Sequence, residues 1–262
     1  MRIGSLFSGI GGLELGLERA GVGHVVWQVE IDPYCRAVLE KHWPKVERRR
    51  DDIRKVHACQ GGNTYCDDCL PPVDVLCGGY PCQPFSIAGH KRGAADPRHL
   101  WPQFARLLRE LRPAYAILEN VTNHLALGFG NVLGDLAGLG YDAEWEVLSA
   151  GALGAHHLRR RVFVIAYRAD AERSRPQGEW PTPKGPWSGE QLEGLVQTAL
   201  RLSVPAGSSG GVSDGIPGRT HRLRALGNAV VPQVAEVVGR RLLQIHEELQ
   251  AGAQVSERKA TP

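Results

Sequence analysis

The chain has 262 residues, enough to bury one complete hydrophobic core and carry a small attached lobe, but hardly two large domains. Its 31 Lys and Arg residues nearly balance 28 Asp and Glu residues, so any nucleic-acid surface must come from local clustering of cations rather than from a general excess. No apolar run reaches membrane-spanning length, and Glu14 and Glu18 interrupt the first apolar stretch, so we predict no signal peptide, no membrane segment and a cytoplasmic protein whose six cysteines are mostly reduced.

The first predicted element is a short strand at residues 3–7, followed by a glycine-rich turn and a helix. The turn reads Ser8-Gly9-Ile10-Gly11-Gly12, and leucines at helical spacing follow it. Glycines at a strand-to-helix turn let a ligand approach the backbone beside the helix amino terminus. Glu14 stands where the dinucleotide pattern G-x-G-x-x-G has its last glycine, so a nucleotide-dependent oxidoreductase is disfavoured.

The second predicted strand, at residues 25–30, ends in an acidic residue. The carboxylate of Glu30 can accept hydrogen bonds from both hydroxyls of a ribose, as acidic residues at this position commonly do. The next segment ends in Asp52-Ile53, which we expect to hold the edge of an adenine. The amino-terminal third therefore indicates a nucleoside-containing ligand.

A cysteine follows the third predicted strand, at residues 73–77. The chain continues Gly78-Gly79-Tyr80-Pro81-Cys82-Gln83-Pro84-Phe85-Ser86. A thiol between two prolines, at the carboxyl end of a buried strand, is expected to be accessible to a ligand rather than buried in the core. We therefore predict that Cys82 is a nucleophile. The alternative is a small buried apolar side chain, as most free cysteines are, and Cys35 and Cys77 fit that description better.

Two further strands are predicted to deliver an acid and a group of cations. The strand at residues 114–119 ends in Glu119, where partial desolvation would let the carboxyl group carry a proton near neutral pH and donate it to a ring nitrogen. The strand at residues 161–167 follows Arg159-Arg160-Arg161, whose guanidinium groups suit a phosphate or a second hydrogen bond to the acid. Read alone, an arginine triplet is more often a solvated face.

These strands and one at residues 143–149 alternate with helical periods, which predicts an α/β fold with a doubly wound, mostly parallel sheet. The carboxyl ends of parallel strands share one crevice, where we expect Gly9, Glu30, Cys82 and Glu119 to meet. Leucines at helical spacing in residues 101–112 and 125–139 indicate core helices rather than a site.

The carboxyl-terminal third changes in composition. Proline, glycine and serine are dense between residues 173 and 218, where Trp180 and Trp187 are the main large apolar groups, and cations cluster on either side, over residues 159–184 and 219–224. We predict one main domain over residues 1–168 and 223–249, with a small inserted region over residues 169–222. Residues 229–249 are predicted to form an amphipathic helix, and residues 250–262 a disordered tail.

Taken in order, these segments resemble the motifs of the cytosine-C5 DNA methyltransferases from residue 3 to about residue 243, with residues 169–220 the main stretch outside the resemblance. Residues 7–12 resemble the family's cofactor loop, Glu30 its ribose ligand, and residues 52–53 its adenine contact. Pro81-Cys82-Gln83 resembles the nucleophile motif, Glu119-Asn120-Val121 the acid motif, and His157-x-Arg159-x-Arg161 the basic motif. Residues 226–232, Leu-Gly-Asn-Ala-Val-Val-Pro, resemble the motif that returns to the cofactor pocket.

The resemblance implies a class I methyltransferase-like fold, S-adenosylmethionine as cofactor, and methylation of carbon 5 of a cytosine flipped out of double-stranded DNA, through a covalent adduct with Cys82. It implies a monomer that works at the nucleoid, of the kind found in restriction-modification systems, with residues 169–222 as its target-recognition region and residues 85–98 as a loop that closes over the flipped base. The catalytic residues would be Cys82, Glu119, Arg159 and Arg161. The cofactor contacts would be Phe7, Ser8, Gly9, Ile10, Gly11, Gly12, Glu30, Ile31, Asp52, Ile53, Gly79, Pro81, Leu100, Asn228, Ala229 and Val230. The DNA contacts would be Gln83, Ser86, Lys91 and Arg92.

The chain departs from the family pattern at three positions. His157 stands where the family usually has glutamine, His156 where it often has proline, and Asp51 where it has glycine. None of these changes removes a reacting group. An RNA methyltransferase of the same family shares nearly every motif and stays open as an alternative, whereas a catalytically silent DNA-binding relative is disfavoured because Cys82 and Glu119 are both present.

A separate group of metal-ligand residue types lies between the adenine-contact and nucleophile motifs. His57, Cys59, Cys66 and Cys69 make a complete tetrahedral zinc set within a polar segment. The alternative is a surface loop with incidental thiols, because only the Cys66-x-x-Cys69 half has tight spacing. In either case the cluster is predicted to be structural rather than catalytic.

Overall fold

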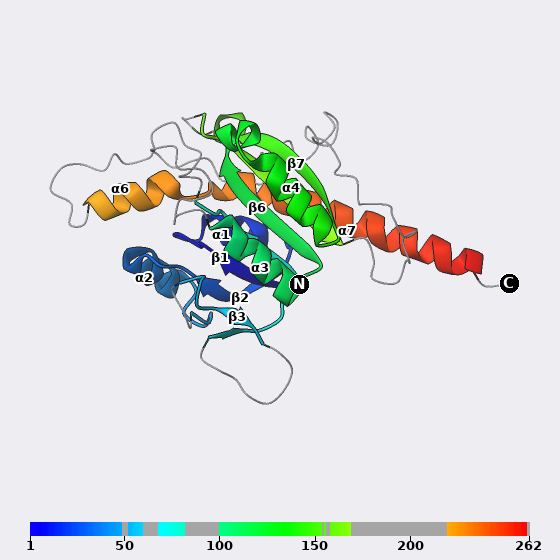
Figure 1. The fold of residues 1–262 in the computed structure, drawn as a ribbon. Helices are drawn as coiled ribbons and strands as arrows, with labels where there is room; N and C mark the ends of the chain where they lie inside the picture. Colours follow the sequence, from blue (N-terminus) through cyan, green and yellow to red (C-terminus); the bar gives the residue numbers. More distant parts are fainter. Residues whose placement is uncertain are drawn as a thin grey trace.

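A six-stranded mixed sheet forms the centre of the molecule (Figure 1). The computed structural model describes residues 1–48, 52–59, 68–81, 100–153, 155, 158–168 and 219–260. Across the sheet the strands run in the order β2-β1-β5-β6-β8-β7. Their bounds are β1 Arg2–Leu6, β2 His24–Val29, β5 Val75–Gly78, β6 Tyr115–Val121, β7 Tyr141–Ser149 and β8 Arg160–Arg168.

Strand direction divides the sheet into two parts. β1 pairs in parallel with β2 and β5, and β5 pairs in parallel with β6. β8 pairs antiparallel with both β6 and β7. The predicted α/β fold with a mostly parallel sheet is therefore confirmed, and the strands lie close to their predicted positions. A second, two-stranded sheet pairs β3 (His57–Ala58) in parallel with β4 (Cys69–Leu70).

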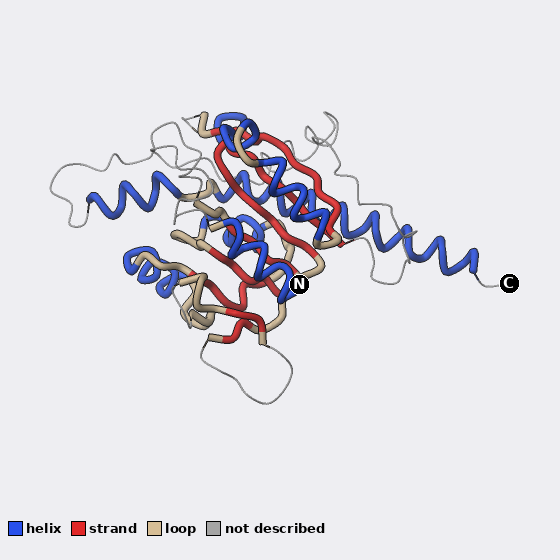
Figure 2. Tube along the Cα trace, viewed as in Figure 1, coloured by secondary structure: helices blue, strands red, loops and turns tan. Residues whose placement is uncertain are grey.

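Helices cover both faces of the sheet (Figure 2). On one face α1 (Gly12–Arg19) and α7 (Pro232–Ala260) pack on a cluster that includes Ile3, Val75 and Ile117. On the other face α3 (Trp101–Leu111) and α4 (Phe129–Gly138) pack on a cluster that includes Leu76 and Leu118. Neighbouring residues of one strand thus belong to opposite faces, as the two-residue period of a strand requires. The other helical elements are α2 (Pro33–His42), α6 (Arg219–Asn228) and the short 3₁₀ helices η2 (Thr122–Ala126) and η3 (Ala150–Leu153).

The last helix is longer than the sequence predicted. α7 runs to Ala260, whereas the helix was expected to end at residue 249 and to be followed by a disordered tail. The buried Arg241 fastens α7 to the sheet, because its Nη2 donates to Glu144 Oε2 on β7 over 2.7 Å. Figure 1 shows the final turns of α7 extending past the sheet.

α1 and α7 approach each other at two glycines. A Cβ at Gly16 would collide with Ala235 and with the carbonyl of Pro232, and one at Gly239 would come within 2.7 Å of the Ala20 Cβ. This close contact ties the glycine-rich turn at the start of α1 to the segment just before α7. Of the helices that the structure describes, none has the length and apolar character needed to cross a membrane.

Candidate active site

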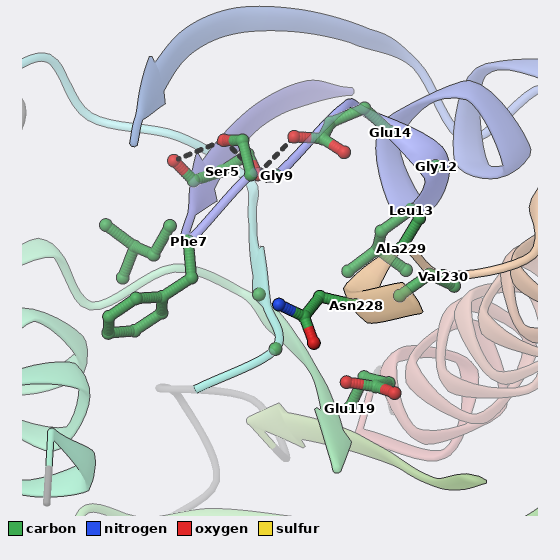
Figure 3. A pocket seen from close by; sticks show the side chains of 14 residues that line it. Ser5, Phe7, Gly9, Gly12, Leu13, Glu14, Glu119, Asn228, Ala229 and Val230 are labelled. Atoms are coloured by element: carbon green, nitrogen blue, oxygen red, sulfur yellow. Dashed lines mark hydrogen bonds between the residues drawn. The ribbon is translucent and has the colours of Figure 1, made fainter. Parts of the chain in front are cut away.

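A cavity lies at the carboxyl edge of β1, β5 and β6 and brings together segments from both ends of the chain (Figure 3). In Figure 3 the side chains of Glu119 and Asn228 point into the same space. The lining residues are Ser5, Leu6, Phe7, Ser8, Gly9, Gly12, Leu13, Glu14, Gly78, Gly79, Glu119, Asn228, Ala229 and Val230. Nine of the predicted cofactor or catalytic residues are in this set. Ile10, Gly11 and Arg159 line an adjoining hollow that shares Gly12, Ala229 and Val230.

The turn between β1 and α1 has the open backbone that the glycines predicted. Gly9 and Gly11 have φ angles of +57° and +86°, in the left-handed region that favours glycine. Phe7 has a φ of +56°, which is strained for a residue with a bulky side chain. No described atom lies within 4 Å of where a Gly9 Cβ would stand, whereas a Cβ at Gly12 would collide with the carbonyl of Val230. The turn is therefore open to a ligand on one side and sealed by residue 230 on the other.

Glu30 is held beside this turn by backbone groups. Its Oε2 accepts a hydrogen bond from the Gly9 N–H over 2.7 Å, and its Oε1 accepts one from the Asp32 N–H over 2.8 Å. Each oxygen keeps a further lone pair, so the oriented carboxylate can still accept the hydroxyl groups of a sugar. Ile31 follows it with 59% of its surface exposed, which leaves an apolar side chain open to a flat ring. Glu30 thus contacts the turn without lining the cavity around Glu119.

The two residues predicted to contact the adenine, Asp52 and Ile53, have different surroundings. Asp52 accepts hydrogen bonds from Nε and Nη2 of Arg54, which holds the pKa of this carboxyl below its usual range. Ile53 is buried in the core on the α3 side of the sheet. Because Asp52 is engaged with Arg54, an adenine contact there would compete with that ion pair.

The acid at the end of β6 is buried and paired. Arg161 Nε lies 3.0 Å from Glu119 Oε1, and Glu119 is only 8% exposed. Burial raises the pKa of Glu119 to about 7, against the opposing effect of Arg161 and Arg159. A Cβ at Gly79 would stand 2.6 Å from Glu119 Oε2, so only glycine allows the β5 turn to approach the acid this closely. A carboxyl group that is part protonated at neutral pH therefore lies against the segment that leads to Cys82.

Arg159 links the basic motif to the returning motif. Its Nη1 donates to the carbonyl of Gly227 over 2.6 Å. Its Nε and Nη2 are buried and have no hydrogen-bond partner among the described residues. Burial, together with the neighbouring Arg161, lowers the pKa of Arg159. The structure thus leaves buried donors beside Glu119 that suit an acceptor brought in by a ligand.

Sequence reasoning missed the environment of Glu14, which it used only to reject the dinucleotide pattern and a signal peptide. Glu14 is fully buried, and its Oε1 accepts a hydrogen bond from Ser5 Oγ over 2.6 Å (Figure 3). Burial raises the pKa of Glu14 to about 6. The signal was an acidic residue on the helix face that also carries Leu13 and Leu17, both buried.

Some predicted residues lie outside the described part of the chain. These are the nucleophile Cys82, the DNA contacts Gln83, Ser86, Lys91 and Arg92, the zinc ligand Cys66, and the family departures Asp51, His156 and His157. The region at 169–218 and the closing loop at 85–98 also lie outside it. Pro81 is described, directly before Cys82, and Leu100 precedes the first residue of α3.

Two of the four predicted zinc ligands are neighbours. His57 and Cys69 are opposite each other in the β3–β4 pair, with His57 Nε2 3.7 Å from Cys69 Sγ. Cys59 follows β3 and is half-buried. Within the described ranges no three His, Cys, Asp or Glu side chains are grouped closely enough to hold a metal ion.

Known proteins are similar in sequence to most of this chain. The sequence model of the C-5 cytosine-specific DNA methylase family matches residues 1–204. The type II methyltransferase M.NgoMIV of Neisseria gonorrhoeae is 36% identical over 180 residues, which cover 67% of this chain and 54% of that protein. M.HhaI of Haemophilus parahaemolyticus is 34% identical over 175 residues, 65% of this chain and 50% of that protein. The chain therefore spans about half the length of these relatives.

The fold is shared with solved structures as well. The crystal structure of the S. pombe Dnmt2 methyltransferase superposes with a TM-score of 0.52, covering 81% of this chain and 58% of that one at 22% identity. At this identity the likeness concerns the fold alone. The family match, by contrast, includes the glycine turn, Glu30, the Pro-Cys-Gln segment and the acid Glu119. The chain belongs to the family of C-5 cytosine-specific DNA methylases.

Proposed function

We propose that this chain transfers a methyl group from S-adenosylmethionine to carbon 5 of a cytosine in double-stranded DNA. The observation that carries the proposal is the placement of Glu119, a buried carboxyl group with a pKa raised to about 7, against Gly79 of the segment that leads to Cys82. The family supports the cofactor in general terms, and the assignment of individual residues is our proposal.

The described residues fit the proposed cofactor. The open side of Gly9 leaves room for a ligand against the backbone, and Glu30 presents an oriented carboxylate to a ribose. Ile31 offers an exposed apolar surface to the adenine. Asn228 brings a polar side chain into the cavity around Glu119. When bound there, S-adenosylmethionine supplies an electrophilic methyl group on a sulfonium ion.

The chemistry of the chain follows from the weak nucleophilicity of cytosine at carbon 5. The Cys82 thiolate adds to carbon 6 and moves electron density toward carbon 5. Glu119 donates its proton, or a strong hydrogen bond, to ring nitrogen 3, which makes that addition easier. Arg161 holds Glu119 in place, and the positive charge of Arg159 also lowers the pKa of this acid. Carbon 5, now electron-rich, accepts the methyl group that the bound cofactor would supply. Loss of the carbon 5 proton to solvent, return of the nitrogen 3 proton to Glu119 and expulsion of Cys82 as a thiolate then restore the aromatic ring.

Access to the base requires that it leaves the duplex, at a cost of a few kcal/mol. We assign Gln83, Ser86, Lys91 and Arg92 to the contacts that offset this cost, and residues 169–222 to target recognition. Apart from residues 219–222, at the start of α6, these residues lie outside the described ranges, and the assignment rests on sequence position and charge. We further propose that the protein acts as a monomer in the cytoplasm, at the nucleoid.

A methylation assay with labelled cofactor on duplex DNA, followed by bisulfite sequencing, tests the proposal. We expect methylation at one sequence context, abolished in Cys82→Ala with cofactor binding retained. Cys35→Ala is the matched control, because Cys35 is buried in α2 away from the cavity, and it should keep activity. Normal turnover by Cys82→Ala would rule out the covalent scheme, and methylation of tRNA in place of DNA would reassign the substrate.

We also propose that His57, Cys59, Cys66 and Cys69 bind a structural zinc ion. The 3.7 Å approach of His57 to Cys69 supports this, because a tetrahedral ion at about 2.1–2.3 Å from each atom holds its ligands at such separations. We expect one equivalent of zinc in protein from metal-replete expression, lost in Cys69→Ser and kept in Cys35→Ser. Metal-free protein with an unchanged melting temperature would refute the site.

A further inference from the structure

Tyr80 lies two residues before Cys82 and is fixed on the sheet face that carries α3 and α4. It is only 4% exposed, and its ring centroid lies 5.2 Å from that of Trp101 and 6.3 Å from that of Phe104. Trp101 is held in turn, because its Nε1 donates to Asp135 over 2.7 Å. The ring of Tyr80 therefore has well-ordered neighbours on the α3 side.

A buried hydrogen bond fixes the other end of the Tyr80 side chain. Its hydroxyl lies 2.7 Å from Nε2 of His124, which is 1% exposed. His124 Nδ1 lies 2.8 Å from the carbonyl oxygen of Leu127. A carbonyl only accepts, so Nδ1 carries a proton. In the neutral imidazole Nε2 is then the acceptor and the Tyr80 hydroxyl is the donor. This tautomer is assigned from the partners rather than observed.

The backbone of Tyr80 is held by the same neighbouring segment. Asn120 Nδ2 donates to the Tyr80 carbonyl over 3.2 Å. Asn120 directly follows the acid Glu119, and His124 lies in η2, which directly follows β6. Both bonds thus connect the turn before Cys82 to the segment that begins at Glu119.

Little rotational freedom separates Tyr80 from Cys82. Pro81 has a fixed φ angle, and a residue that precedes proline is confined to extended backbone conformations. The ψ angle of Pro81 is the main soft dihedral between the two Cα atoms. The backbone of Tyr80 therefore restricts the directions in which the chain can continue after Pro81.

We propose that Tyr80 and His124 are a positioning pair, whose hydrogen bond sets the direction in which the chain leaves β5 and thereby the placement of the Cys82 thiol relative to Glu119. The inference rests on the proposed function. Two apolar rings could fill the same space without the cost of burying polar groups, so packing alone does not require this pair.

The test compares the rate of covalent adduct formation on a duplex that contains 5-fluorocytosine, in the presence of S-adenosylmethionine. For Tyr80→Phe we expect a fall of roughly 10-fold or more, because small displacements of a nucleophile have large effects on rate. Cofactor affinity should be unchanged, since neither Tyr80 nor His124 lines the cavity. The double variant Tyr80→Phe/His124→Phe removes both buried side-chain polar groups. Only the carbonyl of Leu127, a residue that is 44% exposed, loses its donor, so the double variant should recover most of the melting temperature but not the adduct rate.

Tyr115→Phe is the matched control. Tyr115 is buried at the opposite end of β6 and its hydroxyl lies 2.8 Å from His246 Nδ1, so the change removes a bond of the same chemistry far from Glu119. It should lower the melting temperature without slowing the adduct. A wild-type rate in Tyr80→Phe, an equal slowing in Tyr115→Phe, or recovery of rate in the double variant would overturn the inference. A wild-type chain that forms no adduct would instead overturn the proposed function, and the inference with it.

Discussion

Glu119 is the residue whose protonation bears most directly on the proposed activity. Burial raises its pKa to about 7, and the protonated form is the donor that the proposed chemistry needs. The rate of adduct formation should therefore fall as pH rises through about 7. Glu119→Gln can donate a hydrogen bond but cannot supply a proton. We therefore expect the rate of adduct formation to fall by roughly 100-fold or more and to show no further decrease as pH rises through 7. A variant that keeps the wild-type pH profile would show that another group titrates.

Arg161 is predicted to determine the pH at which the rate of adduct formation decreases, the alkaline limb of the pH–rate profile. Its guanidinium, 3.0 Å from Glu119, lowers the pKa of the acid against the effect of burial. Arg161→Gln removes the cation, so the pKa of Glu119 should rise and the alkaline limb should move to higher pH, even if the maximal rate also falls. Single-turnover rates between pH 6 and 9 measure the midpoint pH of this decrease separately from the maximal rate. Movement to lower pH would contradict the assignment.

At the scale of elements, Glu14 makes the stability of the β1–α1 unit depend on pH. Its folded pKa of about 6 lies above the ordinary 4.5 because burial disfavours the charged form. The stability associated with the neutral carboxyl is complete below pH 4.5 and is lost as pH rises through 6, a change of about 2 kcal/mol. Glu14→Gln stays uncharged, so its stability relative to wild type should rise by that amount between pH 4.5 and 7. Urea unfolding at several pH values measures the free energy of unfolding of both proteins. A difference that does not change with pH would contradict the prediction.

The elements also show what the sequence could not predict. Apolar runs located the six strands, but runs such as Val162–Ala166 carry no mark of direction, so the antiparallel pairing of β8 with β6 and β7 was not predicted. The end of α7 was missed because few large apolar residues follow Leu249. Tyr80 and His124 are 44 positions apart, and only the fold makes them partners.

The candidate site was more predictable because its residues follow the strands. Gly9, Gly79 and Glu119 come at or near the carboxyl ends of β1, β5 and β6, so the parallel sheet alone brings them to one cavity. Asn228 comes from the far end of the chain, and its place in the cavity was expected only from the family resemblance. The role of Glu14 needed the structure, because a sequence does not show whether an acidic residue on a helix is buried.

For the whole molecule, cofactor binding should stabilise the fold. A ligand at 100 times its dissociation constant stabilises by about 2.7 kcal/mol, which raises the melting temperature. Glu30→Ala removes the carboxylate that receives the Gly9 and Asp32 N–H groups, so it should abolish most of this shift with S-adenosylmethionine. Glu40→Ala, at the far end of α2, is the control and should keep the shift. An undiminished shift in Glu30→Ala would place the ribose elsewhere.

The backbone at Gly12 lies so close to the carbonyl of Val230 that a Cβ there would collide with it. The order of synthesis therefore determines when this pocket can form. One wall of the pocket comes from the beginning of the chain and the opposing wall from near its end. A ribosome-bound polypeptide that has not yet emerged past residue 230 lacks that second wall. Loading with the methyl donor is therefore expected only after nearly all of these 262 residues have been translated.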